Sequence, residues 1–168
     1  EFNGQADYHS LKLNNLQFNT LGGHIRSALT LDWRQDLTWQ SQTQLHAIKP
    51  GLFWPDYPGE LNGSLQHQGG VSETGPWQLS VTALNISGTL RDYAMKLNGE
   101  MSISDRSGKG DYQFNSPNLV LRHADNSLAL SGQVDENWQL TLQLDLPELA
   151  QTLHHAHGTL NGQFDVTG

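Results

Sequence analysis

The sequence predicts an all-β protein built on a long, curved, antiparallel sheet. Three observations carry this prediction. Apolar and polar residues alternate along most of the chain, as they do in strands with one apolar face. Short segments rich in Gly, Asn and Asp separate the alternating runs, and links this short join only antiparallel neighbours. A glycine recurs inside the apolar pattern, which indicates that the strands bend.

Five runs show the alternation clearly. Their apolar members are expected to share one face of the sheet and to line its interior. The expected lining residues are Ile25, Leu29, Leu31 and Trp33; Trp77, Leu79 and Val81; Met95, Leu97, Met101 and Ile103; Leu128 and Leu130; and Trp138, Leu140, Leu142 and Leu144. Shorter runs lie at 11–13, 16–18, 37–39, 45–47, 112–114 and 119–121. Together these signals predict about nine to eleven strands.

Turn-forming residues lie between the runs. Gly, Asn and Asp adopt the backbone conformations that tight turns require, so these segments are expected to reverse the chain. The expected turns are Gly22-Gly23, 34–36, Gly69-Gly70, 107–110, 124–126 and 135–137.

Two segments depart from the strand pattern. Residues 48–59 hold three prolines and three aromatic residues, so an irregular loop is expected there. Residues 147–157 begin with Pro147, end in histidines and are followed by Gly158, which predicts a short helix near the C-terminus.

Composition excludes several classes of function. The net charge of −8 and the scattered basic residues argue against a nucleic-acid partner. The absence of Cys excludes disulfides, thiolate metal sites and a cysteine nucleophile. No apolar run approaches the roughly 20 residues of a membrane-spanning helix. Residues 1–168 are expected to form a single unit that belongs to a larger repetitive β protein.

A short motif recurs six times: an apolar residue, a small residue, Gly, any residue, and a second apolar residue. The copies are 21–25, 61–65, 86–90, 97–101, 130–134 and 160–164. A glycine inside a strand weakens it, so its repetition indicates a geometric requirement such as curvature or a close approach. These residues alone are compatible with either a bent β-sandwich or an open groove.

The Leu-Asn-Gly copies, together with 145–150 running into 158–162, resemble the TamB branch of the AsmA-like intermembrane bridge proteins, and the resemblance favours a segment from the C-terminal half of such a protein. It implies a U-shaped β-trough with an apolar interior in the periplasm, in a parent protein anchored in the inner membrane. It implies phospholipid transport that supports outer-membrane biogenesis and protein assembly. The implied partners are phospholipid acyl chains and TamA, an outer-membrane protein of the Omp85 family.

Other functions compete with this one. A carbohydrate-binding β-sandwich would stack sugars on Trp54, Tyr57 and Trp77, and a chaperone-like groove would hold strands of outer-membrane proteins. His154, His155 and His157 could offer metal ligands, but histidines at a helix end more often complement the helix dipole. No catalytic motif is present, so we expect neither an enzyme nor a cofactor or metal. The open edges of the sheet are expected to promote self-association.

Overall fold

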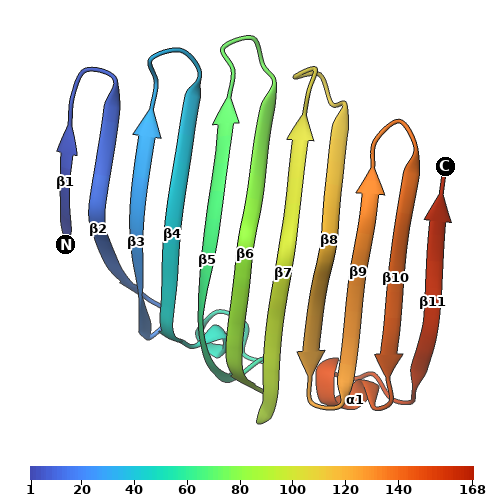
Figure 1. Ribbon diagram of the computed structural model, residues 1–168. Coiled ribbons are helices and arrows are strands. Elements are labelled where there is room, and N and C mark those ends of the chain that lie inside the picture. The colour runs from blue at the N-terminus through green and yellow to red at the C-terminus, as the bar shows by residue number, and fades with distance from the viewer.

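The computed structural model describes all 168 residues and contains one eleven-stranded sheet. Every strand pairs antiparallel with its neighbours in the sequence, from the first strand to the last (Figure 1). The all-β, antiparallel fold is therefore confirmed. The elements are β1 (Phe2–Ala6), β2 (Ser10–Thr20), β3 (Gly23–Asp32), β4 (Leu37–Ile48), the 3-10 helix η1 (Pro50–Leu52), β5 (Gly59–Val71), β6 (Trp77–Leu90), β7 (Tyr93–Asp105), β8 (Tyr112–His123), β9 (Asn126–Val134), β10 (Trp138–Leu146), α1 (Leu149–Thr152) and β11 (Leu160–Thr167).

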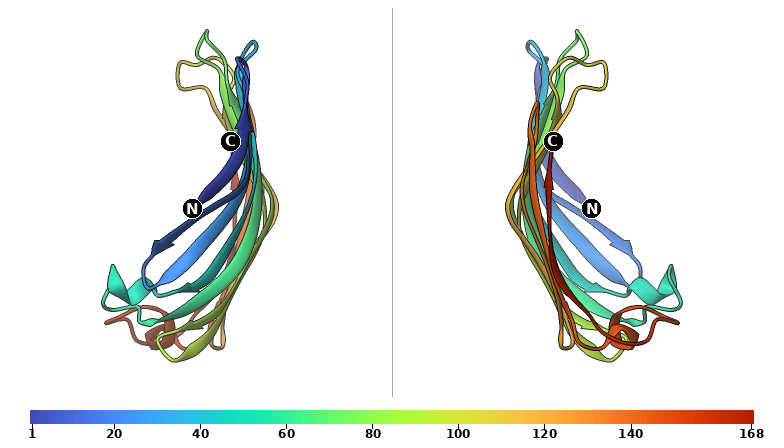
Figure 2. Two further views of the ribbon diagram at one scale, coloured as in Figure 1. Left: turned by 90° about the vertical axis from the view of Figure 1, so that its left-hand side faces the viewer. Right: turned by 90° about the vertical axis from the view of Figure 1, so that its right-hand side faces the viewer.

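The sheet is curved and has a single layer. Figure 2 shows the strands bowed along their length, with η1 and α1 at one end, on the inner side of the curve. No second sheet packs on either face, and the only buried apolar side chains are Ile48, Val81 and Pro50 of η1. This architecture excludes the β-sandwich that the glycine motif alone left open.

Three strands carry a bulge part of the way along their length, and β4 carries a fourth near its end, between Leu45 and Ile48. The pairing register shifts between Leu13 and Leu16 in β2, between Val81 and Leu84 in β6, and between Ser116 and Leu119 in β8. A bulge inserts an extra residue and bends the strand. The apolar residues before and after the bulge consequently point to the same face of the sheet. The separate short runs at 11–13 and 16–18 are therefore one strand, as are those at 112–114 and 119–121.

In five of the six copies, the glycine of the motif lies where neighbouring strands approach closely, and Gly162 on the edge strand is the exception. At Gly99 a Cβ atom would overlap the carbonyl oxygen of Asn118 on the paired strand, and the backbone has a φ of 152°. A side chain at this position would push β7 away from β8. Glycine is therefore required at this position both by the close strand contact and by the positive φ.

Gly69 and Gly70 do not form the predicted turn. Both lie inside β5, and the chain reverses at 72–76 instead. The indole ring of Trp39 lies across Gly69, where a Cβ would overlap it. Gly69 therefore makes room for an aromatic side chain from β4.

The predicted helix at 147–157 is also wrong in its length. Only Leu149–Thr152 are helical, and Leu153 already has the extended φ and ψ of −108° and 123°. A helix this short gains little from its own hydrogen bonds, so side-chain contacts decide its extent. The irregular segment expected at 48–59 runs between the end of β4 and the start of β5 and contains η1.

Candidate functional site: the apolar inner face

The register of the sheet arranges the apolar side chains in rows that cross the strands. Paired residues in antiparallel strands point to the same face, so one residue from each strand contributes to a row. One such row runs without a break from β2 to β11: Phe18, Ile25, Leu45, Gly63, Ile86, Leu97, Leu121, Leu128, Leu144 and Gly162. The next row is Leu16, Ser27, Thr43, Leu65, Leu84, Gly99, Leu119, Leu130, Leu142 and Phe164.

The rows place the expected lining residues together, with one exception. Ile25, Leu97, Leu128 and Leu144 share the first row, and Leu130 and Leu142 share the second. The row one step further along the strands contains Leu29, Val81, Met101 and Leu140. The row after it contains Leu31, Leu79, Ile103 and Trp138. Met95 and Trp77 lie towards opposite ends of their strands. The exception is Trp33. It follows the last residue of β3, and its indole N–H donates to the carbonyl of Tyr8 at 3.1 Å.

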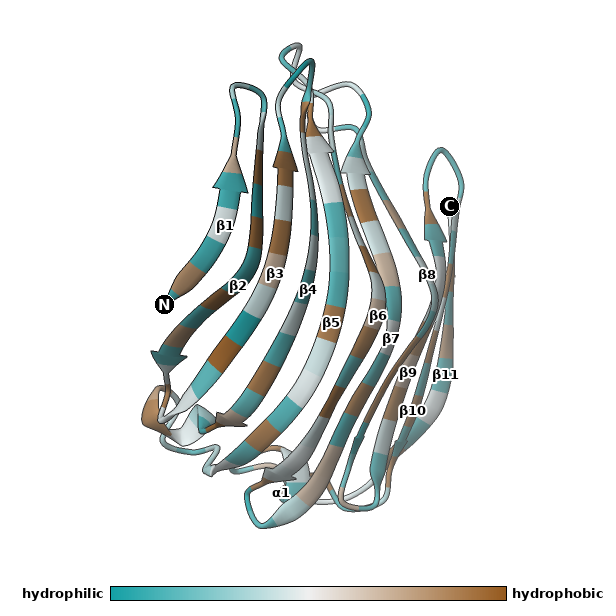
Figure 3. Cartoon of the chain, turned by 60° about the vertical axis from the view of Figure 1, so that its left-hand side comes forward, coloured by the Kyte–Doolittle hydropathy of each residue, from teal (hydrophilic) through white to brown (hydrophobic).

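The apolar face is the inner face of the curve, and it remains largely uncovered. His123 and Met95 are paired in the register, and the α1 residue Thr152 contacts His123 from the same side. Figure 2 shows α1 on the inner side of the sheet, and Figure 3 shows bands of hydrophobic residues recurring on successive strands. Most lining side chains are half-buried, and Trp138 is 49% exposed. The apolar face therefore lacks the partner layer that a closed core would have.

Sequence reasoning missed part of this face. Leu45, Leu65, Ile86, Leu119 and Leu121 belong to the same rows as the expected residues. The glycine motif carried the signal for two of them, since Leu65 and Ile86 flank motif glycines. Leu45, Leu119 and Leu121 lie in shorter alternating runs, and only the pairing register assigns them to this face.

A polar group interrupts the inner face between β3 and β5. The hydroxyls of Ser27, Ser41 and Thr43, here called the hydroxyl cluster, bond to one another at 2.9 to 3.3 Å. His67 pairs with Ser41 in the register, and its Nδ1 accepts a hydrogen bond from Trp39 Nε1 at 3.3 Å. No pattern in the sequence distinguished these residues from outward polar positions.

Residues 147–158, here called the strap segment, lie against one end of the inner face. Asn126 Nδ2 donates to the carbonyl of Glu148 and to Thr152 Oγ1, both at 2.8 Å, and Glu148 N–H donates back to Asn126 Oδ1. Arg91 also donates to the Gln151 carbonyl at 3.3 Å. Asn126 and His123 are each only 3% exposed. The strap segment is thus held mainly by polar contacts.

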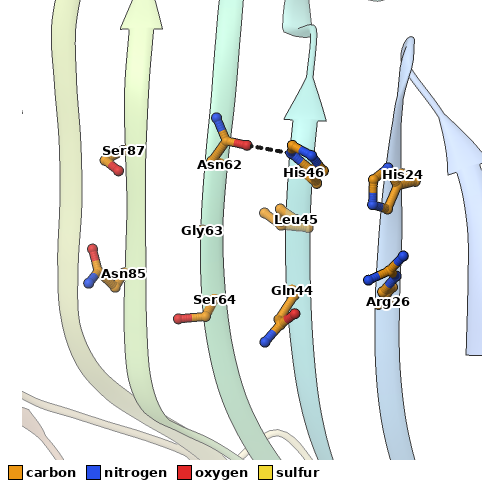
Figure 4. Close-up of a pocket in the computed structure, with 10 residues that line it drawn as sticks. All are labelled: His24, Arg26, Gln44, Leu45, His46, Asn62, Gly63, Ser64, Asn85 and Ser87. Carbon is orange, nitrogen blue, oxygen red and sulfur yellow. Dashed lines mark hydrogen bonds between the residues drawn. The ribbon is translucent and has the colours of Figure 1, made fainter. Parts of the chain in front are cut away.

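The outer face carries the polar residues of the alternating pattern. Figure 4 shows a shallow depression there, lined by side chains such as Arg26, Gln44 and Asn85. His46 shares a 2.9 Å hydrogen bond with Asn62, and its ring lies 4.6 Å from that of His24. Partial burial lowers the pKa of His24, and the nearby His46 and Arg26 lower it further. The lining is almost entirely polar and has no arrangement of nucleophile, base and acid.

The alternative sites gain no support from the structure. Trp77 starts β6 opposite Val71, whereas Trp54 and Tyr57 lie near the other end of β5, about 40 Å away at 3.3 Å per residue. The three aromatic residues therefore form no common sugar platform. No three His, Cys, Asp or Glu residues come together in a group able to hold a metal ion. None of the helices has the length and apolarity needed to cross a membrane.

An open, single-layer sheet with one long uncovered apolar face defines a groove-forming β protein. Comparison with known sequences gives the particular family. The family described as TamB, N-terminal domain, matches residues 1–168, and the chain therefore belongs to the TamB family. Since the match is to the N-terminal domain, the expectation of a C-terminal-half segment is not confirmed.

One curated relative is the translocation and assembly module subunit TamB of Haemophilus influenzae. It is 23% identical over 168 residues, an alignment that covers 100% of this chain and 12% of the relative. The chain thus spans a small part of that protein's length. No solved structure matches the chain.

Proposed function

We propose that the inner face conducts phospholipids between the inner and outer membranes, as one segment of a periplasmic bridge that supports outer-membrane biogenesis. Family membership favours a structural or transport role over catalysis. The observation that carries the proposal is the unbroken row from Phe18 to Gly162, which crosses from β2 to β11 on a face that no other layer covers.

The physical benefit of such a face is large. Each methylene exposed to water costs ~0.8 kcal/mol, so a bare C16 acyl chain would cost on the order of 12 kcal/mol in an aqueous compartment. An apolar row removes much of this cost. Because hydrophobic contact is non-directional, an acyl chain can move along the row without leaving a specific pocket. The ten spacings between the eleven strands, at ~4.8 Å each, give a path of about 48 Å.

The proposal extends to the parent protein. The relative's name describes a subunit of a translocation and assembly module. We place this chain in the periplasm, within a parent anchored in the inner membrane, and we assign TamA of the outer membrane as the parent's partner. The edges at β1 and β11, which lack a second neighbour, are where further strands of the parent would continue the sheet.

Site-specific photocrosslinking in cells tests the proposal. A photoreactive residue at Leu97, Met101, Leu140 or Leu142 should crosslink to phospholipid, because these positions face the groove. The matched positions Gln139 and Gln143 lie on β10 but face outwards, and they should give no lipid adduct. Equal adducts from both faces, or none from the inner face, would refute lipid conduction. Adducts to outer-membrane proteins in place of lipid would favour a chaperone-like groove.

A further inference from the structure

We infer that His67 provides a hydrogen-bond donor for the ester carbonyl of a lipid lying in the groove. This inference rests on the proposed function and assigns a polar contact within it. His67 sits in the groove wall between Ser41 of β4 and Val81 of β6, its register partners on the two sides. Leu29 of the same row and Leu65 two residues earlier on β5 place apolar side chains around it.

The contact with Trp39 fixes the tautomer of His67. Trp39 Nε1–H can only donate, so Nδ1 of His67 must accept and carries no proton. The neutral imidazole then has its proton on Nε2. Gly69 makes this arrangement possible, because the absence of a side chain lets the indole ring of Trp39 lie across β5.

The Nε2–H of His67 makes no hydrogen bond within the protein. His67 is half-buried, and its only side-chain hydrogen bond is the one to Trp39. The hydroxyl cluster beside it differs, because its three hydroxyls bond to one another. An apolar lining needs no N–H donor, and shielding a donor from water without a partner costs free energy. A lipid oxygen would satisfy this donor once acyl chains exclude water from the face.

The surroundings favour an uncharged oxygen. No Lys or Arg forms a hydrogen bond with His67 or with the hydroxyl cluster, and a phosphate placed against an apolar wall without a cation would carry a large desolvation cost. An ester carbonyl lies at the junction between the acyl chain and the headgroup. It can accept from Nε2 while the chain lies on Leu29, Leu65 and Val81.

The test compares two probes that differ only in the carbonyl: 1-lauroylglycerol, an ester, and 1-O-dodecylglycerol, its ether analogue. A neutral hydrogen bond contributes about 0.5–1.5 kcal/mol, so the wild-type chain should bind the ester about twofold to tenfold more tightly by titration calorimetry. His67→Phe should keep binding the ether and lose the preference. His46→Phe, a matched histidine replacement on the outer face, should retain it.

A second measurement does not depend on the folding of the variant. In the wild-type chain, the ¹⁵N resonance of His67 Nε2 should shift on titration with the ester and not with the ether. Equal affinities for both probes, with no shift, would overturn the role of His67 while leaving lipid conduction intact. Binding of neither probe, nor of dodecylphosphocholine, would overturn both. A His67-dependent affinity for dodecylphosphocholine alone would replace the ester with a phosphate and refute the inference as stated.

Discussion

His123 and Thr152 lie 29 residues apart in the sequence and are joined by a hydrogen bond of 3.0 Å between Nδ1 and Oγ1. Its direction follows from the other ring nitrogen. The carbonyl of Leu90 can only accept, so Nε2 of His123 donates to it at 2.7 Å. In the neutral ring, Nδ1 therefore accepts from the Thr152 hydroxyl. This contact attaches the strap segment to β8.

Removing that hydroxyl should loosen the strap segment. Thr152→Val leaves the buried Nδ1 of His123 without a donor and Asn126 without one of its acceptors. We expect the free energy of unfolding to fall by about 1–2 kcal/mol. Amide exchange at 149–153 should become faster. Thr159→Val, an exposed threonine beyond the strap segment, should change neither quantity, and an equal effect of both variants would contradict the assignment.

The motif glycines should differ in their tolerance of a side chain. Gly99→Val would drive a Cβ into the carbonyl of Asn118, and we expect a loss of about 3 kcal/mol or more, measured by urea unfolding. Gly162→Val is the control. It lies in the same motif on the edge strand β11, where the nearest atom to a Cβ is in the Phe164 ring at 3.7 Å. Equal losses would show that close strand contact is not the reason for glycine.

A charge in the middle of the inner face should block the groove. Leu142→Arg places a guanidinium in the row between Leu130 and Phe164, where an acyl chain would have to displace its water. Binding of 1-O-dodecylglycerol should weaken about tenfold or more, measured by titration calorimetry. Gln143→Arg adds the same charge to the outer face of the same strand and should bind as the wild type does. Undiminished binding by a folded Leu142→Arg variant would argue against the groove.

Asp105 should make the stability of the chain sensitive to acid. Burial acts to raise its pKa, but hydrogen bonds from Gly110, Ser107 and Gly108 prevail and lower the pKa below its ordinary value. A lowered pKa means that the carboxylate stabilises the fold fully above the unfolded value of ~3.9 and ceases to do so as pH falls through the folded value.

The variant Asp105→Asn tests this expectation. Its deficit in unfolding free energy relative to the wild type should be greatest above about pH 5 and should shrink below about pH 4. Urea unfolding at several pH values measures the deficit. A deficit that stays constant down to about pH 2 would contradict a role for the charged form.

The free edge of β11 should mediate self-association. Trp138 and Gly168 exchange both backbone hydrogen bonds, and such pairs alternate along antiparallel strands. The N–H of Phe164 therefore points to β10 and that of Gln163 points outwards. Gln163→Pro should reduce concentration-dependent association in sedimentation velocity without disrupting β10 pairing, whereas Phe164→Pro should destabilise the strand. Association unaffected by Gln163→Pro would exclude this edge.

Much of the fold could be predicted because one physical rule dominates it. The outer face of the sheet is polar and packs against no second sheet, so alternation alone assigns residues such as Leu97 and Leu142 to the inner face. Trp33 has the right phase but lies one residue beyond the end of its strand. Alternation along the sequence assigns a residue to one face of the sheet only as long as the strand continues.

What could not be predicted depends on contacts between distant residues. Gly69 looks like a turn residue until Trp39 is placed across it, and the strap segment looks like a longer helix until Thr152 meets His123. His67 is one polar residue among many in β5, and its significance comes from the Trp39 hydrogen bond and from the pairing that puts it on the inner face. Such relationships require the register, which local sequence does not specify.

The strictly sequential strand order also governs how the chain gains and loses its structure. Every strand pairs only with the strands that precede and follow it, so the energetics resemble those of a one-dimensional array of hairpins. Folding can begin at any hairpin with short loop closures and spread outwards. Unfolding should begin at the terminal strands, which have one neighbour each, and should be incomplete at intermediate denaturant concentrations. Amide exchange should therefore slow progressively from β1 and β11 towards β6.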